Sequence, residues 1–126
     1  MPINTYEENR ILSASPLGLV RILYTAATRA VLNARQHLRA GDIAARSKEI
    51  TKAQEILLEL ATAVDPSKAP AFGERLLALY DYMQAQLVEA NVQQKDAPLA
   101  VVDGLLNTLQ EAWSQVEEPE LAHAGR

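Results

Sequence analysis

The sequence predicts an all-α protein, an antiparallel up-down four-helix bundle preceded by a variable N-terminal segment. Apolar residues make up 48% of the 126-residue chain but aromatic residues only 5%, so aliphatic side chains supply the bulk, which favours helix packing over a β-sandwich. Proline, glycine and aspartate residues divide the chain into four segments with apolar residues at helical spacing. Short connections between such segments make neighbouring helices antiparallel.

The first predicted helix spans about residues 15–40. Ser15 followed by Pro16 is typical of an N-cap and a first helical position. Gly41 is a favourable C-terminal stop. The line of apolar residues expected to face the core is Val20, Leu23, Tyr24, Ala27, Val31 and Leu38.

The second predicted helix spans about residues 42–64, with Asp42 as its cap. Asp65 is expected to end it, because the residue before a proline is pushed out of the α region. Ile43 is among its apolar residues, and its core line is Ile50, Ala53, Leu57, Leu60 and Val64.

The third and fourth predicted helices span about residues 70–94 and 97–117. Pro70 begins the third, the run 96–98 separates the two, and Pro119 follows the fourth. Their expected core residues are Leu76, Leu79, Tyr80, Met83, Leu87 and Ala90, then Val102, Leu105, Leu106, Leu109 and Trp113.

The two ends of the chain are predicted to lie outside the bundle. Residues 1–14 form a segment that lies over the bundle or is mobile, and residues 118–126 form a loose tail. Neither a signal peptide nor an apolar run of about 18 residues is visible, so the sequence predicts a cytoplasmic protein without membrane insertion.

The apolar arcs of three helices are wider than a bundle core requires. Two interpretations are open for each flanking residue: it thickens the core, or it belongs to a partner site. The same excess on three helices favours a partner site, since grooves between helices accept amphipathic segments. The flanking residues are Leu19, Ile22 and Ala26, then Ile56 and Leu58, then Leu77, Val88 and Val92.

Nothing in the sequence points to catalysis, a metal or a cofactor. The two histidines, His37 and His123, do not form an i, i+4 pair, and there is no cysteine. His37 is expected to be a solvated residue near a helix C-terminus. A net charge of −4 gives no general attraction for nucleic acid.

Several stretches occur in the order and spacing of one known family. They are Asn4-Thr5-Tyr6, Ser13-Ala14-Ser15-Pro16, Leu19-Val20-Arg21-Ile22-Leu23-Tyr24, Lys52 to Leu60, Leu79-Tyr80-Asp81-Tyr82-Met83, Leu87-Val88-Glu89-Ala90-Asn91 and Trp113. From Asn4 to Trp113 the chain resembles the flagellar secretion chaperones known as FliS. One departure is Thr25-Ala26, where the family usually has Asp-Gly.

The resemblance implies a cytosolic, non-catalytic export chaperone. Such a protein binds the C-terminal segment of newly made flagellin, prevents its premature polymerisation and delivers it to the flagellar type III export apparatus. The alternative is an adaptor or dimerisation bundle that binds a folded partner, and a homodimer is also open. Tyr80 is expected in the core, whereas Asn91 either bonds a partner or caps its own helix. The candidate partner-binding residues are Tyr6, Ile22, Tyr24, Ile56, Leu60, Leu77, Tyr82, Val88 and Asn91.

Overall fold

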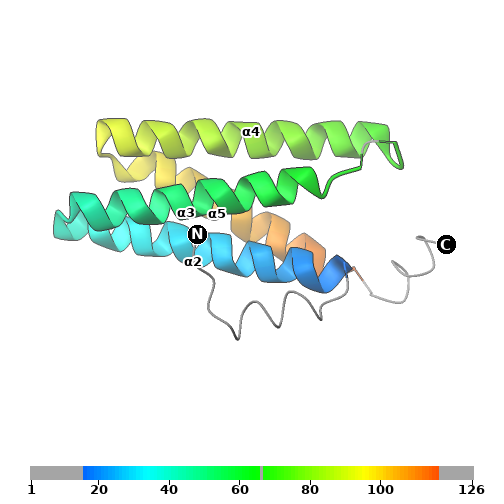
Figure 1. Cartoon of the computed structure of the whole chain (residues 1–126), viewed down its shortest axis with the longest axis horizontal. Coiled ribbons are helices and arrows are strands. Elements are labelled where there is room, and N and C mark those ends of the chain that lie inside the picture. The colour runs from blue at the N-terminus through cyan, green and yellow to red at the C-terminus, as the bar shows by residue number, and fades with distance from the viewer. Residues whose placement is uncertain (1–15, 66, 117–126) are drawn as a thin grey trace.

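The computed structural model describes residues 16–65 and 67–116, and these residues form four α-helices (Figure 1). The prediction of an all-α bundle is confirmed, and the described residues contain no strand. The helices are α2 (Pro16–Ala40), α3 (Ile43–Thr62), α4 (Pro70–Gln93) and α5 (Asp96–Ser114).

Consecutive helices run in opposite directions, as predicted, and close into a ring. Helix α2 packs against α3 and α5, and α4 packs against the same two helices. Helices α2 and α4 therefore lie diagonally opposite each other, with α3 and α5 between them (Figure 1). This arrangement leaves each helix with one outward face.

The core lies on the bundle axis and receives side chains from all four helices. Most of the predicted core lines are buried, but Leu17, Ala30, Ala34 and Leu99 were missed. Val20, Leu23, Leu38, Val64, Leu105, Leu109 and Trp113 are only partly buried and pack around the core.

The connection from α2 to α3 shows how local sequence ends one helix and begins the next. Gly41 has a φ of 74°, a left-handed conformation that costs glycine little. Its N–H donates to the carbonyl of Leu38 at 3.2 Å, and the N–H of Asp42 donates to that of His37 at 2.9 Å, which is the Schellman pattern. Asp42 then caps α3 by accepting the N–H of Ala45, as predicted.

Several helix ends differ from the expected positions, and the largest difference is at α5, which ends at Ser114 and not at residue 117. Helix α3 ends at Thr62, before Asp65, and the Thr62 hydroxyl donates to the carbonyl of Glu59 at 2.8 Å, a local bond that competes with helix continuation. Helix α5 already begins at Asp96, so Pro98 lies within its first turn. Proline is tolerated there because the first N–H groups of a helix have no intrahelical acceptor.

The remaining terminal predictions fall outside the described residues. These are the Ser15 cap, the segment 1–14, the role of Tyr6 and the tail 118–126. Among the helices of residues 16–65 and 67–116, none combines the length and apolarity needed to cross a membrane.

Candidate partner-binding groove

An apolar groove runs between the first half of α2 and the last half of α3. Its volume is about 700 Å³. It is lined by Pro16, Leu19, Val20 and Leu23 from α2, by Glu55, Ile56, Leu58, Glu59 and Thr62 from α3, and by Ala63, which follows α3. Because the helices are antiparallel, the beginning of α2 lies beside the end of α3, and their flanking apolar residues meet there.

Two neighbouring residues of α3 have different roles in this groove. Ile56 is only 3% exposed and forms part of the core, whereas Leu58 is 61% exposed. The sequence placed the two on opposite sides of the core line. For Ile56 the structure supports the interpretation that a flanking residue thickens the core, and not its selection as a free partner contact, because its side chain belongs to the buried core cluster. Leu58 therefore offers free apolar surface, and Ile56 forms the floor.

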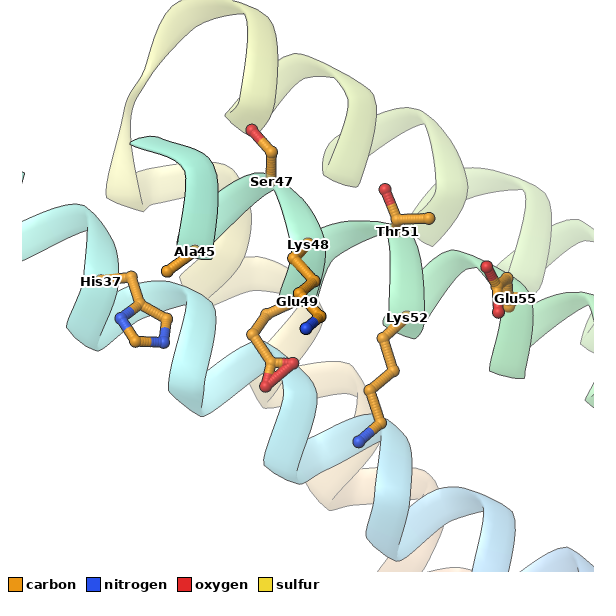
Figure 2. A pocket seen from close by; sticks show the side chains of 8 residues that line it. All are labelled: His37, Ala45, Ser47, Lys48, Glu49, Thr51, Lys52 and Glu55. Carbon is orange, nitrogen blue, oxygen red and sulfur yellow. The ribbon is translucent and has the colours of Figure 1, made fainter. Parts of the chain in front are cut away.

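A second, more polar hollow lies next to the groove, towards the beginning of α3, and shares Glu55 with it. Figure 2 shows that Ser47 and Thr51 point towards α4, whereas Glu49 and Lys52 point towards α2, where His37 lies. Glu49 accepts a hydrogen bond from Asn33 of α2 at 3.0 Å. Glu55 lines both regions, so the surface changes from apolar to polar along α3.

Tyr24 was predicted to face the core and was also named as a candidate partner contact, and the structure places it in the core. It is fully buried, and its hydroxyl is 2.7 Å from the hydroxyl of Tyr80. The Tyr24 ring also lies 6.4 Å from that of Trp113. Burial raises the pKa of both Tyr24 and Tyr80, so each hydroxyl keeps its proton. Tyr80 is a core residue, as expected.

Asn91 bonds within the chain, a possibility that the sequence did not suggest. Its side-chain oxygen accepts from the Arg46 guanidinium at 3.2 Å and from the Ser47 hydroxyl at 2.9 Å. Arg46 also donates to the Asn91 carbonyl and to the Gln94 side chain. A cation at the C-terminus of α4 suits the helix dipole. Arg46 falls on the α3 core face with Ile50 and Ala53, and that register was the signal available in the sequence.

The other predicted contact residues are spread over the molecule. Ile22 is half-buried on α2, Leu60 is buried, and Leu77 packs partly buried against the core. Tyr82 and Val88 are exposed, as the helical spacing predicted, but they lie on α4 and do not line the groove. Of the candidates between residues 16 and 116, the structure places Ile56 alone in the groove lining.

Comparison with known proteins identifies the family. The model of the family described as "Flagellar protein FliS" matches residues 1–120. The chain belongs to the FliS family.

Curated FliS proteins of three bacteria are similar along most of their length. "Flagellar secretion chaperone FliS" of Salmonella typhimurium is 34% identical over 110 residues, covering 86% of this chain and 82% of that protein. The protein of the same name in Bacillus subtilis is 29% identical, covering 94% and 88%. "Flagellar secretion chaperone FliSB" of Pseudomonas aeruginosa is 28% identical, covering 86% of each.

The departure from the usual FliS pattern at Thr25-Ala26 does not fall on the groove. The Thr25 hydroxyl accepts a hydrogen bond from the Gln110 amide of α5 at 3.0 Å, and Thr28 donates to the same side chain at 3.3 Å. Residue 25 therefore contributes to the packing of α2 on α5. Within residues 16–65 and 67–116, no group of acidic or histidine side chains could hold a metal ion.

Proposed function

We propose that this FliS protein is a cytoplasmic chaperone that binds the C-terminal segment of newly made flagellin, its client. It keeps the client from polymerising prematurely and delivers it to the flagellar type III export apparatus. The observation that carries the proposal is the apolar groove between α2 and α3, which offers Leu19, Val20, Leu23 and Leu58 to an amphipathic segment.

The physical basis is the burial of surface that would otherwise drive self-association. An amphipathic client segment that is disordered before assembly folds as it binds, and its apolar face is removed from water. The lining changes from apolar to polar along α3. This change fits a client segment that is apolar in one part and polar in the next. Binding of this kind requires no nucleotide, metal or chemical step.

Isothermal titration with the flagellin C-terminal segment tests the proposal. Leu58→Asp should weaken the complex by at least about 2 kcal/mol, on the order of 30-fold in affinity, if Leu58 is a desolvated anchor. Leu32→Asp is the matched control, because Leu32 is an exposed leucine of α2 outside the groove. No binding by the wild-type chain, or equal effects of the two substitutions, would defeat the proposal.

A further inference from the structure

The outward face of α4 carries a second apolar surface, separate from the groove. We call it the α4 outer strip, and it consists of Ala78, Tyr82, Ala85, Val88 and Val92, all exposed. Tyr82 is 48%, Val88 52% and Val92 73% exposed. The strip extends for about 21 Å along the helix. Single exposed apolar residues are ordinary, but a contiguous strip is typical of an interaction surface.

Acidic residues accompany this strip. Glu74, Asp81 and Glu89 are exposed on the same side of α4, about two helical turns apart. Within the described ranges no ion pair involves any of the three, and they outnumber Arg75, the single basic residue of α4, so the helix is net acidic. Their charges are available to a partner, and they favour one that carries lysine or arginine beside its apolar row.

The same charges disfavour a second copy of this chain as the occupant. An antiparallel contact between two α4 helices, centred on Ala85, would bring Asp81 of one copy beside Glu89 of the other. A parallel contact would place each carboxylate beside its own equivalent. Both arrangements bring like charges together at an interface, which is costly.

The two ends of the chain are also poor complements to the strip. Residues 1–15 contain two glutamates and one arginine, and residues 117–126 contain three glutamates, one arginine and one histidine. The side-chain charges sum to −1 in residues 1–15 and to −2 in residues 117–126, so neither segment offers a surplus of lysine or arginine. The chemistry of the strip therefore calls for a different polypeptide.

We infer that the α4 outer strip docks an amphipathic helix of a second protein, one whose apolar row is flanked by lysine or arginine. The inference goes beyond the proposed function, because the strip and the groove share no residue. Because the groove lies between α2 and α3 and the strip lies on exposed residues of α4, we expect the bundle to hold a client and this partner at the same time.

Two synthetic 20-residue helical peptides test the inference on the full chain. Both carry the same leucine row, flanked by lysine in one peptide and by glutamate in the other. Fluorescence anisotropy should show at least tenfold tighter binding of the lysine peptide, and amide NMR shifts should centre on residues 78–92. The double variant Tyr82→Ser/Val88→Ser should lose at least tenfold in affinity, while Leu58→Ser, which changes an exposed leucine of the groove, should bind this peptide normally.

A charge-reversed variant separates specific docking from general attraction to an acidic protein. Asp81→Lys combined with Glu89→Lys should invert the preference, so that the glutamate peptide binds more tightly. Shifts centred on the α2–α3 groove, or an unchanged preference, would overturn the inference. A wild-type dimer in sedimentation that Tyr82→Ser/Val88→Ser dissolves would assign the strip to a second copy and overturn it as well. The two proposals are tested by different variants. Loss of flagellin binding in Leu58→Asp tests the groove, whereas the strip variants should still bind flagellin and lose only the lysine peptide.

Discussion

The guanidinium of Arg35 on α2 holds the carboxylate of Asp96, the first residue of α5, through two parallel hydrogen bonds of 2.8 and 2.9 Å. The third nitrogen of Arg35 donates to Asp103 at 3.0 Å, about two turns further along the same face of α5. This fork fixes α2 against α5, and the Thr25 and Thr28 bonds to Gln110 continue the contact. Another side of α2 faces α3, and there the first half of α2 lines the groove.

The Arg35–Asp96 pair predicts acid sensitivity. The hydrogen bonds from Arg35 lower the pKa of Asp96, so its contribution to stability is present above the unfolded value of about 3.9 and is lost as the pH falls below it. Because the Asp96 side chain is 41% exposed, we expect Asp96→Asn to cost only about 1 kcal/mol at neutral pH. Urea unfolding at pH 7 and pH 3 should show this cost shrinking in acid. Asp81→Asn, which removes an exposed carboxylate without a hydrogen bond, should lose no stability at either pH.

The Tyr24–Tyr80 hydroxyl pair predicts coupled effects on stability. Tyr24→Phe or Tyr80→Phe leaves the other buried hydroxyl without its partner, so each should cost about 1–3 kcal/mol. The double variant should cost less than the sum, because it leaves no unpaired hydroxyl. Unfolding can be followed by the fluorescence of Trp113, whose ring lies near Tyr24. Additive effects would contradict the direct bond.

The Arg46–Asn91 contact predicts a role in stability that is separate from binding. Asn91→Ala removes the side-chain acceptor of a buried guanidinium and should cost about 1.5–3 kcal/mol. Titration of the folded variant with the flagellin segment should give the wild-type affinity. A stable Asn91→Ala variant that binds weakly would instead return Asn91 to the partner surface.

Ile56 and Leu58 should separate stability from binding. Ile56→Ala opens a cavity in the core and should cost about 2–5 kcal/mol. Leu58→Ala changes a surface residue and should alter stability by no more than about 0.5 kcal/mol. Thermal melts of both variants check this difference, and similar melting temperatures would show that Ile56 is not a core residue.

Residues 1–12 are predicted to be dispensable for folding. The four helices supply the whole described core. A chain lacking residues 1–12 should therefore keep its melting temperature in thermal melts. Loss of the folded state on truncation would contradict this prediction.

The sequence by itself determined the number of helices and several of their ends. Gly41, Asp42 and Pro70 act through the conformation or hydrogen bonding of their own backbone neighbourhood, so their effect can be read without knowing what packs nearby. The 3.6-residue period likewise separated Tyr80 from Tyr82, because it places one towards the bundle axis and the other away from it.

Only the tertiary structure decided which of the flanking residues are free to bind. Ile56 and Leu58 are both apolar residues at the edge of the same core line, yet the position of α2 covers the first and leaves the second exposed. The burial of Arg46 could not be predicted from its own helix either. Its charge is stabilised by hydrogen bonds to oxygen atoms at the end of α4, which only the packing of α3 against α4 brings into reach. Periodicity fixes the direction of a side chain from its helix axis, but burial depends on the neighbouring helix that lies in that direction.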